Sequence, residues 1–272
     1  MSRITRVEGR IDISAARQGK LMPPDHVITP WHRLRRAVDG WLPMPITHVV
    51  PGQRRESADV LTRRRKVVAA TSVAGATLLG FSLSTEPDST PFYALTLGTA
   101  AAWSLGGLAS GPLHRGWIED HERRLRRPWI TPIATGVGAF GVFYVGALVA
   151  RQIPFAERAI RSILQFAEEG NMPLVLLTTY ANGVGEEIFF RGALYAALPS
   201  HQAATASTGI YALATTTTRN PSLVLAAVLM GSLFALQRRA TGGLQAPLLT
   251  HLTWSTLMVR YLPPLFRTQT PA

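Results

Sequence analysis

The apolar residues of this chain are gathered in long blocks, and that grouping limits the folds it can adopt. The first three blocks cover residues 67–83, 92–113 and 128–150, and further blocks follow from Met172 towards the C-terminus. Blocks of about 17–25 apolar residues match the roughly 30 Å hydrocarbon core of a bilayer, because a helix rises about 1.5 Å per residue. We therefore predict an integral membrane protein.

The predicted fold is an all-α, polytopic transmembrane bundle with about seven spans. The spans are predicted at residues 67–83, 92–113, 128–150, 172–198, 201–218, 221–237 and 243–262, of which the fifth is short and threonine-rich. Residues 154–167 instead alternate apolar and charged positions with helical spacing. This pattern predicts an amphipathic helix, either lying in the membrane interface or packed on the extracytoplasmic loops.

The predicted organisation has four parts. A basic, partly disordered cytoplasmic tail covers residues 1–66, and two N-terminal transmembrane helices with a basic loop cover residues 67–127. A transmembrane core covers residues 128–262, and a short tail covers residues 263–272. The core has no predicted loop long enough for a soluble domain, so its chemistry is expected within the bundle.

Basic residues account for the net charge of +12, and 14 of the 28 Lys and Arg lie in residues 1–66. Further basic clusters lie at residues 114–127 and 237–239, between predicted spans. Such clusters favour the cytoplasmic side and bind anionic lipid head groups, which predicts a multi-pass plasma-membrane protein with a cytoplasmic N-terminus. No nucleic-acid recognition motif accompanies the charge, so we expect no nucleic-acid partner.

Small residues recur in two of the predicted spans. The second contains a GxxxG pair, and the third contains four glycines: Gly107 and Gly111, then Gly136, Gly138, Gly141 and Gly146. Because apolar side chains gain little from leaving lipid for another helix, small residues that allow close approach drive helix association. These glycines therefore predict helix packing.

Two adjacent carboxylates stand out within the fourth predicted span. Glu186 and Glu187 are the only acidic residues after Gly170. A carboxylate at bilayer depth costs about 2.5–3.5 kcal/mol on insertion scales, so such residues are candidates for function. Some property of the site must offset that cost.

Helical geometry separates the two glutamates. Glu187 and Arg191 are spaced i,i+4, which predicts a charge pair on one helix face. Glu186 is rotated by about 100° and has Phe190 at i+4, so it is left without a partner. A desolvated, unpaired carboxyl suits a general base or acid. The structural alternative, a buried ion pair that locks two helices, explains Glu187 without explaining Glu186.

His251 is the only histidine in the interior of a predicted span, since His201 stands at the edge of the fifth, and it lies at about the same depth as the two glutamates. A lone buried histidine is more often structural than a ligand. At this depth, however, it can share a site with the carboxylates, around either a metal-bound or a Glu-activated water.

Two motifs resemble one family of membrane proteases. EEIFFRG at residues 186–192 resembles the EExxxR motif of the CAAX-protease and bacteriocin-processing (CPBP, or Abi) family, whose members are related to the type II CAAX prenyl endopeptidases. The stretch RRATGGLQAPLLTHLTWSTL at residues 238–257 is similar to the last motif region of that family. The resemblance covers roughly residues 130–262.

The resemblance implies a bundle with a water-containing cavity open towards the cytoplasm. It assigns Glu186 to activating water together with a second-motif histidine. It assigns His251, together with an asparagine, to stabilising the oxyanion or to holding a metal. A Zn²⁺ ion with the ligands Glu186, Glu187 and His251 is the cofactor this implies, and Arg191 completes the first motif.

The chain departs from the family pattern at two positions. Thr215 stands where the second motif has its histidine, and Ser255 stands where the third motif has asparagine. Threonine cannot replace an imidazole base, and loss of an oxyanion donor alone costs about 10²–10³ in rate. His201 is the alternative base, although it lies at the membrane edge.

Three functions remain open from the sequence. The first is an intramembrane endopeptidase that cleaves peptide or lipidated-protein substrates near the cytoplasmic side. The second is a degenerate relative that binds or scaffolds partners without cleavage. The third is a proton- or cation-coupled transporter that uses Glu186 and Glu187, although we find no inverted repeat between the chain halves.

Overall fold

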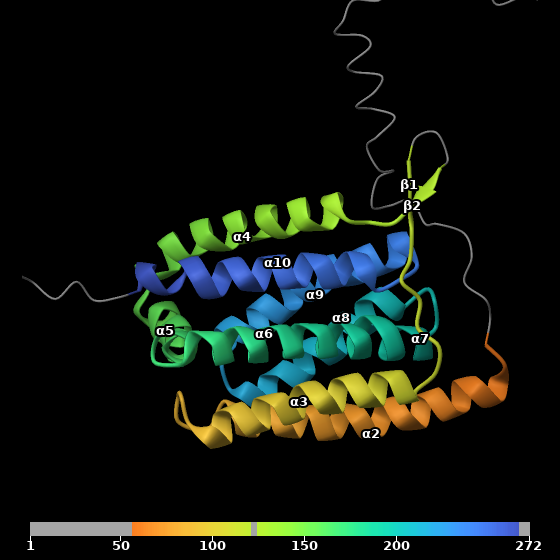
Figure 1. Cartoon of the computed structure of the whole chain (residues 1–272), viewed down its shortest axis with the longest axis horizontal. Helices are drawn as coiled ribbons and strands as arrows, with labels where there is room; N and C mark the ends of the chain where they lie inside the picture. Colours follow the sequence, from red (N-terminus) through yellow and green to blue (C-terminus); the bar gives the residue numbers. More distant parts are fainter. Residues whose placement is uncertain (1–55, 121–123, 267–272) are drawn as a thin grey trace, which may run out of the picture. The chain divides into compact units, whose positions relative to one another are not determined.

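A computed structural model describes residues 56–120 and 124–266 of the chain, and this part is almost entirely helical (Figure 1). The only strands in the described ranges are β1 (Ile118–Glu119) and β2 (Leu125–Arg126), which pair antiparallel within the predicted basic loop. The predicted all-α class is confirmed. Residues 1–55, most of the predicted tail, lie outside the described ranges.

Every predicted span is helical over most of its length, although the fourth is divided among three consecutive helical elements, and the predicted amphipathic segment is a helix as well. The helices are α2 (Ala58–Ser82), α3 (Thr90–Ala109), α4 (Ile130–Ala150), α5 (Pro154–Glu168), α6 (Met172–Glu186), α7 (Tyr195–Ala197), α8 (Ala203–Thr215), α9 (Pro221–Thr241) and α10 (Gln245–Tyr261). Between α6 and α7 the chain continues as a π-helix, Glu187–Leu194. Two 3₁₀ turns, Thr216–Thr218 and Pro263–Leu265, follow α8 and α10.

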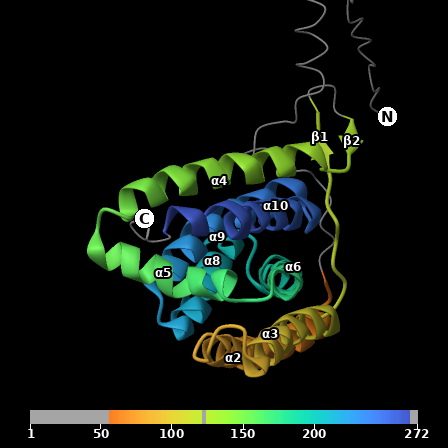
Figure 2. The same cartoon turned by 60° about the vertical axis from the view of Figure 1, so that its left-hand side comes forward.

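The helices stack in layers, with α2 and α3 on one side, α4 and α10 on the other, and α6, α8 and α9 between them (Figures 1 and 2). One end of the bundle contains α5 and is called the α5 end. There the α2–α3 loop contacts the start of α6, where the Asn171 N–H donates to the Asp88 carboxylate. The Tyr93 hydroxyl also donates to Asp88, and these bonds lower the pKa of that carboxyl. The opposite end, the hairpin end, joins the β1 segment to α9, where the Trp117 N–H donates to the Thr241 carbonyl.

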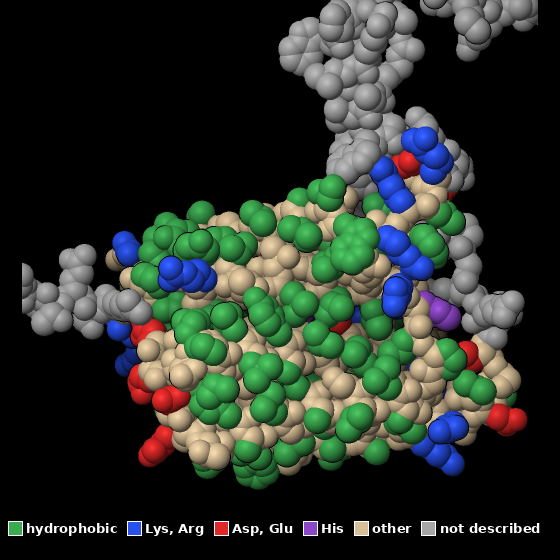
Figure 3. Space-filling view, in the orientation of Figure 1, with side chains coloured by type: hydrophobic (Ala, Val, Ile, Leu, Met, Phe, Trp, Pro, Cys, Tyr) green, Lys and Arg blue, Asp and Glu red, His purple; other side chains and the backbone are tan. Residues whose placement is uncertain are grey.

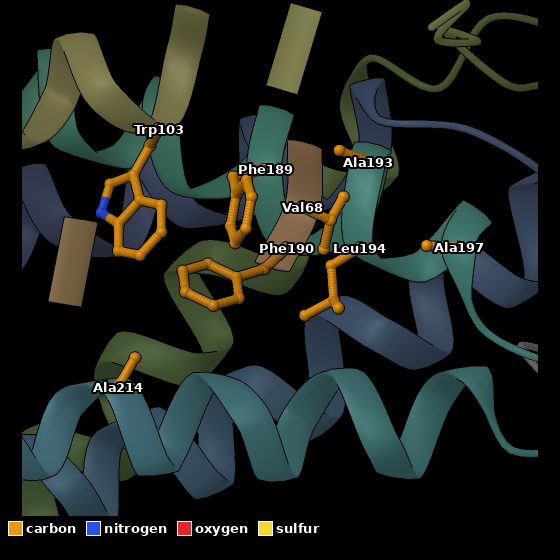
Figure 4. Packing of buried hydrophobic residues seen from close by; sticks show 8 residues of the cluster. All are labelled: Val68, Trp103, Phe189, Phe190, Ala193, Leu194, Ala197 and Ala214. Atoms are coloured by element: carbon orange, nitrogen blue, oxygen red, sulfur yellow. The ribbon is translucent and has the colours of Figure 1, made fainter. Parts of the chain in front are cut away.

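An aromatic cluster holds the π-helix against α3 (Figure 4). The ring centroid of Trp103 lies 4.6 Å from that of Phe189 and 4.9 Å from that of Phe190, and all three side chains are buried. Aromatic pairs at such separations stabilise by about 0.5–1.5 kcal/mol beyond the area they bury. The cluster therefore fixes the segment that carries the first motif.

Helix α2 begins earlier than predicted. Residues 58–66, which we predicted to belong to the tail, form its first turns. Arg64 is fully buried and is bound by the Glu56 carboxylate, while its Nη1 donates to Ser110 Oγ at 2.9 Å. A sequence of consecutive basic residues does not reveal which one is enclosed, and the prediction placed all of them in the basic tail.

Two described helices, α4 and α9, are long and apolar enough to cross a membrane. Core helices of soluble proteins have the same composition, but only 11% of the apolar window in α4 is buried within the bundle. Hydrophobic side chains are spread over the middle of the face in Figure 3 among other uncharged surface, while most charged side chains lie towards its ends. This distribution suits a lipid-facing surface, since soluble proteins rarely expose large contiguous apolar patches.

The number of spans stays a prediction. The fifth predicted span corresponds to α8, whose 13 residues extend for only about 20 Å at the α-helical rise. The 3₁₀ turn Thr216–Thr218 lengthens it, but α8 remains shorter than the roughly 30 Å hydrocarbon core.

The glycines of α4 differ in what surrounds them, which gives a matched test. A Cβ on Gly136 would lie 2.7 Å from Thr253 Cβ and 2.8 Å from the Thr250 carbonyl oxygen, whereas a Cβ on Gly141 would have no atom within 4 Å. We expect Gly136→Ala to destabilise by about 1–3 kcal/mol because it forces α4 away from α10. Gly141→Ala is expected to leave the thermal unfolding midpoint in detergent unchanged or raised. Equal midpoints for the two variants would contradict the α4–α10 packing.

Candidate active site

A cavity of about 210 Å³ lies among α2, α6, α8, α9 and α10. Its lining includes Glu186, Tyr211, Thr215 and His251. These residues are separated by up to 65 positions in the chain, so only the packing of the helices brings them together. The cavity therefore brings together three residues that the sequence analysis singled out, Glu186, Thr215 and His251, and one that it did not, Tyr211.

The predicted ion pair between Glu187 and Arg191 forms behind the cavity lining, where Glu187 contacts His251. Both side chains are fully buried, and Arg191 Nη1 donates to Glu187 Oε1 at 3.4 Å. Arg191 Nη2 donates to the Gly231 carbonyl at 3.2 Å, which ties the pair to α9. The guanidinium carbon also lies 4.6 Å from the ring centroid of Tyr211, where a cation–π contact is favourable.

The first motif passes through a change of helix type. Glu186 is the last residue of α6, and Glu187 is the first residue of the π-helix. π-Helical turns are rare and occur frequently at functional sites. Here the change of helix type falls between the two glutamates, and their side chains bind different partners.

His251 completes the buried group. Its Nδ1 lies 2.9 Å from Glu187 Oε1, and its ring stacks on Phe234 with centroids 4.7 Å apart. A carboxylate paired with Arg191 only accepts hydrogen bonds, so Nδ1 carries the ring proton. The same tautomer leaves the Nε2 lone pair free, and a Cβ placed on Gly183 would lie 3.9 Å from Nε2.

Glu186 has a partner that the sequence analysis missed. The Tyr211 hydroxyl donates to Glu186 Oε2 at 2.6 Å, so the expectation of an unpaired carboxyl was wrong. The Glu186 side chain is half-buried and faces the cavity. The contact joins residues 25 positions apart on different helices, and helical spacing within one segment cannot indicate such a contact. A tyrosine inside a predicted span was the one available signal.

Residues 168–257 match the family model described as "Rce1-like: Type II CAAX prenyl endopeptidase Rce1-like". This segment of the chain is similar to that family. The matched segment runs from the end of α5 to α10 and contains every residue of the candidate site named above. A search of curated proteins and a search of solved structures each found no match.

This similarity directs attention to the two departures noted in the sequence. Thr215 lines the cavity, but its hydroxyl donates to the Tyr211 carbonyl at 2.9 Å. Ser255 is buried one turn beyond His251 and is not among the described residues that line the cavity. His201 is exposed before the start of α8 and also lies outside the lining. None of the three occupies a place beside Glu186 comparable to that of Tyr211.

The zinc ligands implied by the resemblance are Glu186, Glu187 and His251. Glu187 Oε2 is buried without a hydrogen-bond partner in the described part of the chain, so it has a free lone pair. However, Glu187 and His251 bind each other, and the Arg191 guanidinium shares the same carboxylate. The described residues contain no group of three or more His, Cys, Asp or Glu side chains placed to hold a metal. They do not fit a three-ligand zinc site, and zinc stays a prediction.

Proposed function

We propose that this protein is an intramembrane endopeptidase in which Glu186 activates the hydrolytic water. The observation that carries the proposal is the shared cavity, which places a half-buried carboxylate and the His251 imidazole on one lining. The match to type II CAAX prenyl endopeptidases supports this reaction class. A general base that is positioned in a site shielded from bulk water contributes about 10²–10⁴ to the rate.

In the proposed reaction, Glu186 accepts a proton from water as the water oxygen attacks the peptide carbonyl carbon. The carbonyl π electrons move to oxygen, and the tetrahedral intermediate carries the resulting negative charge. When the intermediate collapses, the C–N bond breaks and the protonated Glu186 returns its proton to the leaving nitrogen. The products are a new carboxyl terminus and a new amine, so atoms and charge balance.

His251 is proposed to assist through Nε2. Because Glu187 Oε1 holds Nδ1 at 2.9 Å, the imidazole has one fixed orientation and one tautomer. In that tautomer Nε2 accepts hydrogen bonds, so it would accept one from the attacking water and orient that water beside Glu186. Arg191 in turn holds Glu187, so the buried pair positions His251 and contacts no substrate.

The substrate is proposed to be a peptide or a lipidated protein, and the bond is cleaved in the half of the membrane nearer the cytoplasm. The hairpin end carries the basic residues of the 114–127 loop and of the α9 C-terminus, which favour the cytoplasmic side. On this assignment the chain has seven spans in the plasma membrane, with a cytoplasmic N-terminus and head groups of membrane lipids bound to the basic clusters.

Cleavage is tested directly with the purified protein in detergent. A membrane-peptide library is incubated with the wild type and with Glu186→Ala, and the products are compared by mass spectrometry. The proposal expects products that depend on Glu186. If the two product spectra are the same, the assignment of Glu186 as the base is rejected.

Tyr211 offers a separate test, because its hydroxyl supports Glu186. Tyr211→Phe removes one hydrogen bond to a carboxylate, a bond that contributes about 1.5–3 kcal/mol, so kcat is expected to fall by about 10–100-fold. Loss of that bond also makes the carboxylate harder to ionise, and the acid limb of the pH–rate profile moves to higher pH.

Tyr195→Phe is the matched control. Tyr195 is another buried tyrosine, packed beside Arg238 and absent from the described cavity lining. Its variant should keep the wild-type pH profile. A Tyr211→Phe profile that coincides with both would show that the Tyr211 hydroxyl does not act on Glu186.

One observation favours the alternative of a non-cleaving relative that binds or scaffolds membrane partners. Thr215 stands where the family motif has histidine, and its hydroxyl is engaged by the backbone. On this alternative, peptides bind in the cavity but no product forms, and Glu186→Ala changes binding without changing the product spectrum.

A further inference from the structure

The candidate cavity continues beyond the catalytic group along one face of α9. Residues 223, 226, 227, 230 and 234 all line it, and their spacing of three and four positions marks a single helical stripe. From Leu223 to Phe234 this stripe extends for about 16 Å at the α-helical rise. His251 lies beside its Phe234 end, where the two rings stack with centroids 4.7 Å apart, and Glu186 lines the same cavity.

The burial of the lining changes along this stripe. Phe234 is fully buried, and Met230 and Ala227 are each 3% exposed. Ala226 and Leu223 are half-exposed, as are Leu79 and Thr218 on the opposite walls. The cavity is therefore closed at the Phe234 end and becomes accessible towards the start of α9.

The hairpin side of the site is filled by buried polar groups. Arg191 and Glu187 are fully buried there, and Arg238 Nε donates to the Arg191 carbonyl at 2.7 Å. Gln237 Nε2 donates to Thr250 Oγ1 at 2.8 Å and closes the space between α9 and α10. These contacts block a direct path from the hairpin end to Glu186.

We infer that substrate enters this site from the α5 end, with an apolar stretch of its polypeptide lying along the Leu223–Phe234 stripe of α9. This inference rests on the proposed function for the identity of the occupant. The stripe and Glu186 line the same cavity. A polypeptide segment bound along the stripe would therefore belong to the substrate that Glu186 cleaves. Most of its lining outside the catalytic group is apolar, with Leu79, Met230 and Trp254 among these residues, which suits aliphatic side chains; Asn182 and Thr218 are the polar exceptions.

The direction of entry differs from the opening implied by the family resemblance. The basic clusters assign the hairpin end to the cytoplasm, so the α5 end faces the opposite side of the membrane. A substrate segment would then reach Glu186 from the extracytoplasmic half of the bundle. Phe234 lies in the C-terminal half of α9 (Pro221–Thr241), so the inner end of the stripe is nearer the hairpin end than the α5 end.

The chain has no cysteine, so single-cysteine variants report access without background. Ala227 and Ala235 are both buried alanines of α9, but only Ala227 lines the cavity. Glu86→Cys in the α2–α3 loop marks the α5 end, and Arg239→Cys marks the hairpin end; both positions are exposed. Each variant is reconstituted into vesicles and treated with a membrane-impermeant methanethiosulfonate reagent from one side at a time.

We expect Ala227→Cys to react from the side that labels Glu86→Cys, while Ala235→Cys remains unmodified from either side. Reaction of Ala227→Cys from the side that labels Arg239→Cys would overturn the inferred direction. So would a complete lack of reaction while Glu86→Cys is labelled. The labelling experiment does not require the protein to cleave a peptide, so it tests the entry route even if the protease proposal fails.

A second arm tests the occupant. Leu223→Trp narrows the outer part of the stripe, whereas Leu225→Trp is placed on the exposed face of the same helix. With the membrane-peptide library, Leu223→Trp should lose the products that depend on Glu186, and Leu225→Trp should keep them. If Leu223→Trp retains every product and the wild type is active, the route along α9 is rejected while the protease function remains.

Discussion

Replacing Glu186 with glutamine is expected to reduce peptide cleavage by about 10²–10⁴-fold, the contribution of a positioned general base. Glutamine keeps the shape of the side chain, and its amide oxygen still accepts the hydrogen bond from the Tyr211 hydroxyl. The fold should therefore persist, and the thermal midpoint in detergent should stay within a few degrees of the wild type. The measurement is kcat on a peptide identified from the library.

Glu157→Gln is the matched control for that variant. Glu157 forms a part-exposed ion pair with Arg161 on α5 at 2.9 Å and does not line the cavity. Its substitution removes the same charge and should leave kcat unchanged. Full activity in Glu186→Gln would assign water activation to another group.

Removing Arg191 is expected to have the largest effect on stability. Arg191→Met leaves the Glu187 carboxylate buried without its cation, and breaking a buried pair in this way costs about 3–5 kcal/mol. The lost bond to the Gly231 carbonyl adds to this cost, because it also joins the π-helix to α9. The measurement is the free energy of unfolding in detergent.

A double variant shows whether the lost stability of Arg191→Met comes from breaking the Glu187–Arg191 ion pair. Glu187→Leu with Arg191→Met removes both charges, so it should be less destabilised than Arg191→Met alone. The part-exposed Glu157–Arg161 pair on α5 provides the contrast. Arg161→Met is expected to lower the free energy of unfolding by no more than about 1 kcal/mol. If the double variant is as unstable as the sum of its single variants, the two charges do not depend on each other.

The positions of the helices could be predicted from the sequence, because a helix that crosses the hydrocarbon core needs an apolar block of about 17–25 residues. The predicted span at residues 128–150 and α4 (Ile130–Ala150) differ by two residues at one end. The start of α2 could not be predicted, because Arg64 becomes buried only through Ser110 and Glu56, which lie elsewhere in the chain. Residues with strong helix propensity continued the helix into the predicted tail.

The candidate site could be predicted only in part. The i,i+4 spacing correctly predicted the Glu187–Arg191 contact, because that contact lies within one helical segment. The π-helix was not predicted, since a local widening leaves no trace in hydrophobic periodicity. Tyr211 was missed because its contact with Glu186 depends on how α8 packs against α6. Contacts between distant segments can be predicted only when the three-dimensional fold is known, whereas contacts within one helix follow from the spacing of the residues.

Hydrolysis at Glu186 is tested most directly by isotope incorporation. The purified wild type and Glu186→Gln are incubated with the same peptide library in H₂¹⁸O, and each product is sequenced by mass spectrometry. The account predicts one ¹⁸O atom in the new carboxyl terminus of the wild-type products and a loss of these products in Glu186→Gln. Labelled products at equal yield in both proteins, or none in the wild type, would contradict it.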